Sequence, residues 1–286
     1  MAVCEGTPAN ELERDDIARA VLADFRERER PGPGGMGLPA PGSRLPHARF
    51  AQCVDHTLLR TDATKAEIER LCDQALEWDF VAVCVNGSWV SLCADRLSDG
   101  DVRVASVVDF PLGAMTSLEK ARETREVVEA GAHEIDMVAP IARMLGGEWS
   151  HAEDDIRGVV DAAAGRAVKV ILETAALTPL QIVHGALVAK RAGARFVKTS
   201  TGFHPAGGAT SEAVELLRFV VGDACGVKAA GGIRDCAAAL KMLGAGATRL
   251  GTSSAVALAR CLGRPAATLR ELVADPARHV DVCEMV

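Results

Sequence analysis

The amino-acid sequence predicts an α/β protein built as a (β/α)8 barrel, or TIM barrel, with an N-terminal helix and a Pro/Gly-rich linker in front of it. The first observation is that short apolar segments alternate, from about residue 50 onward, with segments of helical periodicity. The second is the number of repeats: eight of them fill roughly 220 residues, close to the usual size of this barrel. An open doubly wound sheet is the alternative, but it gives no reason for the repeats to stop at eight.

Residues 1–47 are expected to form an N-terminal extension and linker, and residues 48–286 the barrel domain. Asn10 is a good N-cap, and residues 11–30 carry an apolar stripe at helical spacing. The stripe consists of Ile17, Val21, Leu22 and Phe25. The following PGPGGMGLPAPGSRLP cannot hold a regular element. Its G-x-G-x-x-G at 32–37 has no strand before it and no helix after it, so we interpret it as a chance match to the dinucleotide-binding pattern.

The strands of the barrel are expected at 51–55, 80–85, 102–108, 134–138, 168–173, 195–199, 225–229 and 248–252. Capping boxes, in which a Thr and an acid or amide three residues later cap each other's backbone, mark three helix starts. They begin at Thr64, Thr116 and Thr178. Gly131 and Gly193 stand where helix C-caps are expected. These signals support the order of strands and helices that a barrel requires.

Charge and composition exclude several classes of function. The formal net charge is −7, aromatic residues make up 3 % of the chain, and Tyr is absent. Such a chain is poorly suited to bind a nucleic-acid backbone or an anionic membrane surface, so we expect neither partner. A basic-then-apolar leader and a run of about 18 apolar residues are both missing from the sequence, which favours a cytoplasmic location.

The nine cysteines show neither a metal-binding nor a disulfide pattern. No two of them have C-x-x-C spacing, and no two of the seven His residues have H-x-x-x-H spacing. We therefore expect no metal site, no disulfide framework and reduced thiols, as in a cytosolic enzyme.

Two lysines near the ends of neighbouring strands are the first candidates for chemistry. Lys198 (FVKTSTGF) and Lys228 (GVKAAGG) stand out because the chain has only seven Lys against 25 Arg. Arginine cannot act as an amine nucleophile, whereas lysine can. A second ammonium about 4 Å away costs roughly 4 kcal/mol at an effective dielectric constant near 20, enough to lower one lysine pKa by about 3 units. A salt-bridged lysine is the plain alternative for either residue, and Lys169, at the beginning of its strand, is expected to be structural.

Carboxylates at the strand ends are the second group of candidates. Asp136 (HEIDMV) should point into the barrel, where it either neutralises a lysine or relays protons during imine chemistry. Asp55 and Thr57 end the first strand, where turn capping is the alternative reading. Cys84 is expected to be a packing residue.

Glycine-rich ends of the last two strands are the third group. Gly231-Gly232 and Gly251-Thr252-Ser253-Ser254 offer close backbone approach, amide donors and hydroxyl groups. In these barrels phosphate is bound by the loops after strands seven and eight and by a helix N-terminus. Two such loops in that place favour a phosphate site over ordinary turns.

With these residues in place, the chain resembles the deoxyribose-phosphate aldolase family over about residues 50–258. The resemblance runs through VDHTLL, VAVCVN, FPLGA, EIDMV, ILET, FVKTSTGF, VKAAGGIR and TRLGTSS. It implies reversible cleavage of 2-deoxy-D-ribose 5-phosphate to acetaldehyde and D-glyceraldehyde 3-phosphate, without metal or organic cofactor. It also implies a Schiff base on Lys198, a pKa-lowering role for Lys228 and a proton relay at Asp136.

The same resemblance assigns the substrate-binding residues. These are Asp55, Thr57, Thr201, Gly202, Gly231, Gly232, Gly251, Ser253 and Ser254. The chain departs from the family at Phe203, where some members carry Lys, at Met115 and Asp109, and in having no C-terminal Tyr. A phosphate-sugar isomerase and a catalytically silent sugar-phosphate-binding barrel remain alternatives, and a homo-oligomer such as a dimer is compatible with the sequence.

Overall fold

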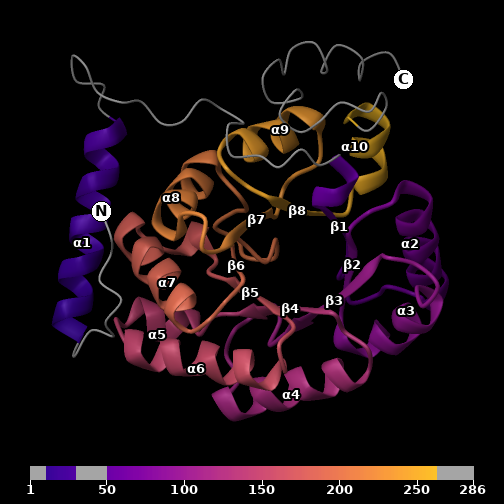
Figure 1. Ribbon diagram of the computed structural model, residues 1–286, viewed down its shortest axis with the longest axis horizontal. Coiled ribbons are helices and arrows are strands. Elements are labelled where there is room, and N and C mark those ends of the chain that lie inside the picture. The colour runs from indigo at the N-terminus through magenta and orange to yellow at the C-terminus, as the bar shows by residue number, and fades with distance from the viewer. Residues whose placement is uncertain (1–10, 30–49, 263–286) are drawn as a thin grey trace.

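The computed structural model describes residues 11–29 and 50–262, and within them it forms a ring of helices around a closed barrel of parallel strands (Figure 1). The strands follow one another in chain order from β1 to β8, and β1 pairs with β8 to close the barrel. The expected (β/α)8 barrel is therefore confirmed. Its strands are β1 (Val54–Leu58), β2 (Ala82–Val85), β3 (Arg103–Val108), β4 (Glu134–Val138), β5 (Ala167–Ile171), β6 (Phe196–Lys198), β7 (Gly226–Ala230) and β8 (Arg249–Thr252).

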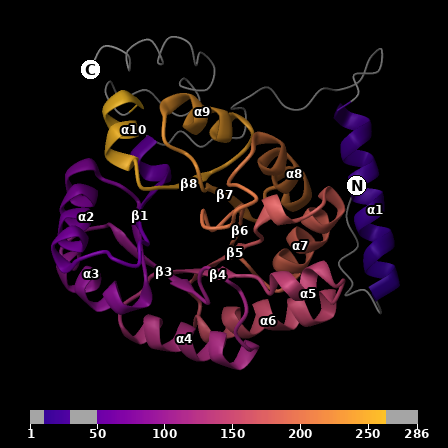
Figure 2. The same ribbon diagram turned by 180° about the vertical axis from the view of Figure 1, so that it is seen from behind.

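The helices lie outside the strands in both views of the molecule (Figures 1 and 2). They are α1 (Glu11–Glu29), α2 (Lys65–Trp78), α3 (Val90–Arg96), α4 (Ser117–Glu129), α5 (Ile141–Leu145), α6 (Trp149–Ala162), α7 (Pro179–Arg191), α8 (Ser211–Val221), α9 (Cys236–Gly244) and α10 (Ala255–Leu262). Short 3-10 turns cover Phe50–Cys53, Gly87–Trp89 and Thr174–Ala176.

Local signals in the sequence set most of the helix ends. Thr64 and Thr178 form capping boxes with Glu67 and Gln181, and Thr116 accepts a hydrogen bond from the backbone N–H of Glu119. The expected start of the first strand was three residues early, because Phe50–Cys53 form a 3-10 turn with Phe50 buried. The expected Asn10 cap and the 32–37 glycine pattern lie outside the described residues.

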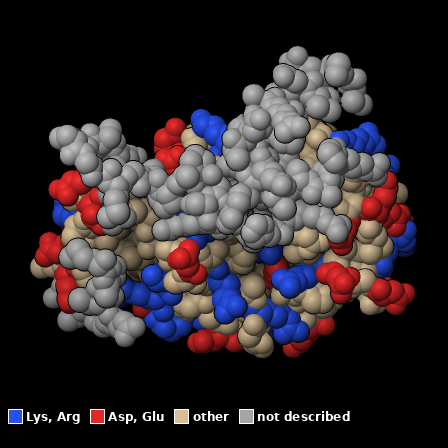
Figure 3. All heavy atoms as spheres, turned by 45° about the horizontal axis from the view of Figure 1, so that its top comes forward, with Lys and Arg blue, Asp and Glu red and all other residues tan. Residues whose placement is uncertain are grey.

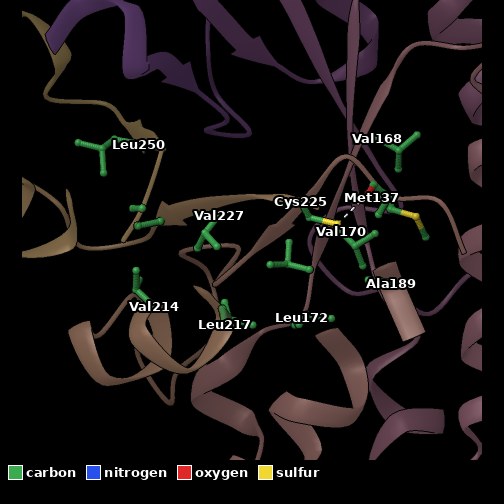
Figure 4. Packing of buried hydrophobic residues seen from close by; sticks show 14 of the residues in the cluster. Met137, Val168, Val170, Leu172, Ala189, Val214, Leu217, Cys225, Val227 and Leu250 are labelled. Carbon is green, nitrogen blue, oxygen red and sulfur yellow. Dashed lines mark hydrogen bonds between the residues drawn. The ribbon is translucent and has the colours of Figure 1, made fainter. Parts of the chain in front are cut away.

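The apolar core lies between the strands and the helices. Strand side chains alternate between the two faces of the sheet, and those that point outward, such as Ile135, Met137, Val168 and Leu250, are buried against the helices. Figure 4 shows this layer, where strand residues meet Val214 and Leu217 of α8 and Ala189 of α7. Alternate strand residues therefore point into the barrel itself, and there the sequence places its charged groups.

Helix α1 docks on the outside of the same chain's barrel, beside α7 (Figures 1 and 2). Leu22 and Phe25 are buried, and the ring of Phe25 lies 5.3 Å from that of Phe219 on α8. Arg14 donates to Glu153 of α6 at 2.6 Å, and Asp15 pairs with His184 of α7 at 2.8 Å. The apolar stripe read from the sequence is therefore the face that packs on this barrel.

One disulfide corrects the expectation that all thiols are reduced. Cys236, in the first turn of α9, is bonded to Cys261 of α10. The absence of close cysteine spacing could not reveal this pair, because the two residues are 25 positions apart and meet only when consecutive helices pack around β8. Free thiols in the described chain are those of Cys53, Cys72, Cys84, Cys93 and Cys225.

The described surface carries both signs of charge. On the face seen in Figure 3, Lys and Arg side chains are interspersed with Asp and Glu side chains. No helix in residues 11–29 or 50–262 has the length and apolar character needed to span a bilayer.

Candidate active site

Lys198 and Lys228 lie directly opposite each other on neighbouring parallel strands. They are register partners between β6 and β7, so both side chains point into the barrel. Asp136 reaches the same interior from β4. Lys198 is 2 % exposed, and the other two are fully buried. The strand periods of three separate sequence segments thus bring the predicted catalytic residues together.

One carboxylate oxygen holds both amines. Lys198 Nζ and Lys228 Nζ each donate to Asp136 Oδ2 at 2.7 Å. Lys228 also donates to Asp55 Oδ2 on β1. Lys228 is therefore fixed between two carboxylates, whereas Lys198 has one carboxylate that it shares.

The two lysines differ in their protonation equilibria for this reason. Burial lowers the pKa of Lys198, the positive charge of Lys228 acts in the same direction, and the Asp136 carboxylate opposes both without reversing them. Burial also acts to lower the pKa of Lys228, but the carboxylates of Asp136 and Asp55 outweigh it and raise that pKa. The sequence argument attributed the lowered pKa to the neighbouring ammonium, whereas the structure makes burial the larger cause. The result is one reactive amine beside one permanent cation.

Asp136 stays ionised among these cations. Burial by itself would raise its pKa, but the charges of the neighbouring lysines, that of Lys169 foremost, outweigh that effect and hold the pKa well below its usual range. Asp136 therefore stays an acceptor for the amines around it. Its position within hydrogen-bond distance of both Lys198 and Lys228 is suited to passing protons between a bound substrate and the lysines.

A second group of buried charged residues contacts these three. Lys169 Nζ donates to Asp136 Oδ1 and contacts Glu134 Oε2, both at 2.6 Å. Arg249 bridges Asp55 Oδ1 at 2.6 Å and Glu134 Oε2 at 3.0 Å. Lys169 was expected to be only structural, but it is the register partner of Asp136 on the neighbouring strand and its ammonium reaches that carboxylate.

The wall formed by β2 and β3 is apolar. Cys84, Ala105 and Val107 pack with Leu59 and the ring of Phe110 inside this part of the barrel. Cys84 is thus a packing residue, and burial raises the pKa of its thiol. Charged groups therefore occupy one side of the interior and small apolar groups the other.

Thr57 stands at the end of β1 on the level of Cys84. Its hydroxyl donates to the backbone oxygen of Asp55 at 2.9 Å, and its side chain is half-buried. Asp55 itself lies deeper in the barrel and is bound by Lys228 and Arg249. Both residues border the interior beside Lys228.

The glycine loops after β6 and β7 touch through their backbones. A β-carbon at Gly231 would lie 3.2 Å from the Cα of Gly202, and both glycines have positive φ, +92° and +85°. Gly232 follows with φ +81° and is exposed. Only glycine allows this approach and these backbone angles together. The loops thereby present bare backbone at the carboxyl ends of the strands.

The loop after β8 is tied to the loop after β7. Thr252 Oγ1 donates to the backbone oxygen of Ile233 at 2.7 Å and accepts from the backbone N–H of Ser254 at 2.9 Å. Ser253 is exposed, and Ser254 is half-buried just before α10. Gly251 lies deeper, next to Lys228. Gly251, which is also expected to border the phosphate, thus lies beside the side chain of one of the two candidate lysines.

Thr201 is fully engaged with the protein. Its hydroxyl and its backbone N–H both donate to the carboxylate of Glu173, and the hydroxyl accepts from the N–H of Phe203. Glu173, two residues after the end of β5, adopts a left-handed backbone conformation with φ +56°, and its carboxylate faces this loop. Thr201 thus shapes the loop that carries Gly202.

Two departures from the family pattern lie at the mouth of the barrel. The rings of Phe203 and Phe110 meet edge to face at 5.2 Å, from loops that follow the non-neighbouring strands β6 and β3. Asp109 is buried and pairs with Lys120 at 3.2 Å, and it accepts from the N–H of Met115 at 3.0 Å. The Asp109 substitution therefore fixes the loop that carries Phe110.

Sequence reasoning missed Glu134, Arg249 and Ser200. The signal for Glu134 was available, because it stands two residues before Asp136 and therefore points into the same interior. The same spacing relates Arg249 to Gly251. Ser200 has a buried hydroxyl with no hydrogen-bond partner among the described residues and lies beside Gly231. In residues 11–29 and 50–262, no three His, Cys, Asp or Glu side chains gather in a way that could hold a metal ion.

A closed parallel barrel with a buried lysine of lowered pKa next to a carboxylate defines an enzyme of the class I aldolase type. The comparisons with known proteins agree. The sequence profile described as DeoC/LacD family aldolase matches residues 49–258. The chain belongs to the DeoC/LacD aldolase family.

Individual relatives extend this result. A deoxyribose-phosphate aldolase from Geobacillus sp. is 50 % identical over 210 residues, which cover 73 % of this chain and 94 % of the relative. The crystal structure of a putative deoxyribose-phosphate aldolase from Coccidioides immitis has a TM-score of 0.77 and 35 % identity, covering 88 % of this chain and 97 % of the other. The tetrameric deoxyribose phosphate aldolase from Aeropyrum pernix has a TM-score of 0.70 and 31 % identity, covering 86 % and 98 %.

Proposed function

We propose that the chain is an aldehyde-lyase that reversibly cleaves 2-deoxy-D-ribose 5-phosphate to acetaldehyde and D-glyceraldehyde 3-phosphate through a Schiff base on Lys198. The observation that carries this proposal is the placement of Lys198 and Lys228 on one oxygen of Asp136. The names of the relatives support the choice of substrate.

The groups at the site can balance each step of that reaction. The neutral amine of Lys198 adds to the C1 aldehyde of the open-chain sugar, and loss of water leaves a protonated imine. Removal of the C3 hydroxyl proton then breaks the C2–C3 bond, releases D-glyceraldehyde 3-phosphate and sends the bonding electrons to the imine nitrogen as an enamine. Protonation of C2 and addition of water release acetaldehyde and restore Lys198. Asp136, within hydrogen-bond distance of both lysines, is the group that we assign to these proton transfers.

The phosphate is assigned to the loops after β6, β7 and β8. Gly202, Gly231 and Gly232 offer backbone that a phosphate can approach closely, and Ser253 and Ser254 precede α10. Asp55 and Thr57 complete the substrate site from β1. The apolar wall of Cys84 and Val107 is suited to the deoxygenated end of the sugar, which has no hydroxyl group at C2.

A phosphate-sugar isomerase is a weaker candidate. Such an enzyme needs a carboxylate base that takes a proton from carbon and has no use for a pair of buried lysines. Here Asp136 is shared by the two lysines, Asp55 and Glu134 are also paired with lysine or arginine, and Glu173, which follows β5, accepts from Thr201. A silent binding protein would have no need for a buried amine of lowered pKa.

Assembly and location are part of the proposal. A homo-oligomer, either a dimer or a larger assembly, is supported by the tetramer described for the Aeropyrum pernix relative. A phosphorylated sugar is charged and stays inside the cell that makes it, which supports a cytoplasmic site of action. Light scattering of the purified protein measures its oligomeric state.

Borohydride reduction in the presence of deoxyribose 5-phosphate, followed by peptide mass mapping, tests the central proposal. Reduction should add the two-carbon ethyl group of the trapped acetaldehyde imine to Lys198. A label on Lys228 would reverse the roles of the two lysines. Cleavage of the sugar without any label would remove the Schiff-base mechanism.

A further inference from the structure

Three buried charged residues inside the barrel have no part in the steps above. They are Glu134, Lys169 and Arg249; Lys169 is the register partner of Asp136, and Arg249 is that of Lys228. Lys169 alone contacts three carboxylates: Glu134 and Asp136 at 2.6 Å, and Asp55 at 3.6 Å. Removing a lysine and its three acidic partners from water costs free energy, so we expect this group of charges to have a role in the active site.

Counting the buried charges shows what that could be. The ion pairs of the interior join three carboxylates, which are Asp55, Glu134 and Asp136, to four basic groups, which are Lys169, Lys198, Lys228 and Arg249. The buried carboxylate of Glu173 follows β5 and accepts hydrogen bonds from Thr201, and no ion pair among the described residues includes it. From β2 only the buried Cys84 thiol can titrate, and burial raises its pKa; from β3 the inward side chains Ala105 and Val107 carry no charge. Arg103 reaches Glu134 from the strand end, but its side chain is 54 % exposed and its charge is solvated.

A buried group of charges is most stable when it is electrically neutral, because an excess charge in a poorly polarisable interior is costly. Three carboxylates match three cations, so one of the four basic groups must be without its extra proton. Arg249 cannot lose one. Lys169 has three carboxylate contacts and Lys228 two, while Lys198 has only a shared oxygen of Asp136. The neutral member is therefore Lys198.

We propose that Lys169 is a positioning residue for the aldolase reaction: its ammonium completes the charge balance of the barrel interior and thereby keeps Lys198 as the amine without a proton. This inference rests on the proposed function. Lys169 also holds Asp136 Oδ1, which leaves Oδ2 for the two catalytic lysines. It acts through Asp136 and through the total charge, and it does not touch Lys198 in any contact of the described structure.

The charge balance makes a prediction of opposite signs at two remote positions. Lys169→Met removes a positive charge, so protonation of Lys198 restores neutrality and the enzyme should need a higher pH to work. Glu134→Gln removes a negative charge, so protonation of Lys198 becomes less favourable and the enzyme should work at a lower pH. Glu134 contacts Lys169 and Arg249 but not Lys198. A loss of packing or of a direct contact at Lys198 would therefore not move the pH profiles of the two variants in opposite directions.

The experiment is the pH dependence of kcat/KM for deoxyribose 5-phosphate in wild type, Lys169→Met, Lys169→Arg and Glu134→Gln. We expect the acidic limb of the profile to move up by about one pH unit or more in Lys169→Met, which is about a tenfold loss at a pH below the limb. Lys169→Arg should return the limb toward that of wild type, and Glu134→Gln should move it down. Borohydride trapping at each pH should follow the same shifts.

Two further proteins separate this effect from a structural one. Lys120→Met removes another fully buried lysine, one that pairs with Asp155 and Asp109 outside the barrel interior, and should lower stability without moving the limb. The double variant Lys169→Met/Glu134→Gln removes one charge of each sign and should restore the limb, which also tests the idea if Lys169→Met alone does not fold.

A limb that stays in place in Lys169→Met and in Glu134→Gln, or that moves in the same direction in both, would overturn the proposal. Wild-type trapping keeps this failure distinct from failure of the proposed function. If Lys198 is labelled and the limb does not move, only the role of Lys169 is wrong.

Discussion

Gly251 of β8 packs its bare Cα against the side chain of Lys228. A β-carbon at this glycine would lie 2.9 Å from Lys228 Cε and 3.1 Å from the Cβ of Ala230. The φ angle of Gly251 is not in the left-handed region, so the requirement for glycine comes from the space that Lys228 occupies. Gly251 thus leaves the space in which the side chain of Lys228 lies.

Gly251→Ala is expected to displace the ammonium of Lys228 from Asp136 and Asp55. Overpacking of this kind costs roughly 1–3 kcal/mol, and we expect a loss of kcat of at least about tenfold. Gly158→Ala is the matched control, because a β-carbon there meets nothing within 4 Å and the residue lies within α6. It should leave kcat unchanged and the melting temperature equal or higher. Equal kcat for Gly251→Ala and wild type would contradict the role given to Gly251.

Substitution of the two lysines that we propose as catalytic should have different consequences. Lys198→Ala should abolish imine trapping and nearly all turnover. In Lys228→Leu the amine of Lys198 remains, but one of the positive charges that lower its pKa is gone, so that pKa should rise toward the ordinary value. Since the deprotonated amine is the reactive form, activity should fall at neutral pH and recover in part as the pH approaches 10. A profile of Lys228→Leu that is lowered equally at every pH would argue against this cause.

The phosphate assignment can be tested at Ser253. This residue is exposed, so Ser253→Asp should fold normally while placing a negative charge in the loop assigned to phosphate. We expect KM for deoxyribose 5-phosphate to rise roughly tenfold, since repulsion of two charges near a surface costs one to several kcal/mol. The kcat/KM for 2-deoxyribose, which has no phosphate, should hardly change. An equal loss with both sugars would place the phosphate elsewhere.

Helix α1 should contribute to stability and not to chemistry. Phe25→Ala removes a buried ring that packs on Phe219 and should lower the free energy of unfolding by about 3 kcal/mol, while kcat stays within about twofold of wild type. Leu12→Ala on the same helix is the control, because Leu12 is 78 % exposed. Denaturant unfolding measures the first quantity. If Phe25→Ala keeps its stability but loses turnover, the helix has a role in the reaction.

Metal removal should have no effect on the reaction. The protonated imine draws electrons from the breaking C2–C3 bond, so the proposed steps need no Lewis acid. Activity should survive prolonged dialysis against EDTA. Loss of turnover that a divalent ion restores would disprove the mechanism.

The sequence by itself determined the order of elements, because the signals for that order are local. Apolar runs of strand length, the capping boxes at Thr64 and Thr178 and the glycines after the helices each act within a few residues. The strand period also fixed that Lys198, Lys228 and Asp136 point into the barrel, once the number of repeats had indicated a closed one. Boundaries were less certain where a strand competes with another local structure, as at Phe50–Cys53.

Only the tertiary structure decided which charged groups meet. That Lys169 reaches Asp136, that Arg249 joins Asp55 to Glu134 and that Gly251 makes room for Lys228 depend on strand register and on the reach of long side chains across the barrel. The pairing of Cys236 with Cys261 depends in the same way on how two helices pack. These contacts join residues far apart in the chain, and their energies come from burial and from neighbouring charges. No pattern within a single segment contains that information, and the protonation of Lys198 is set by it.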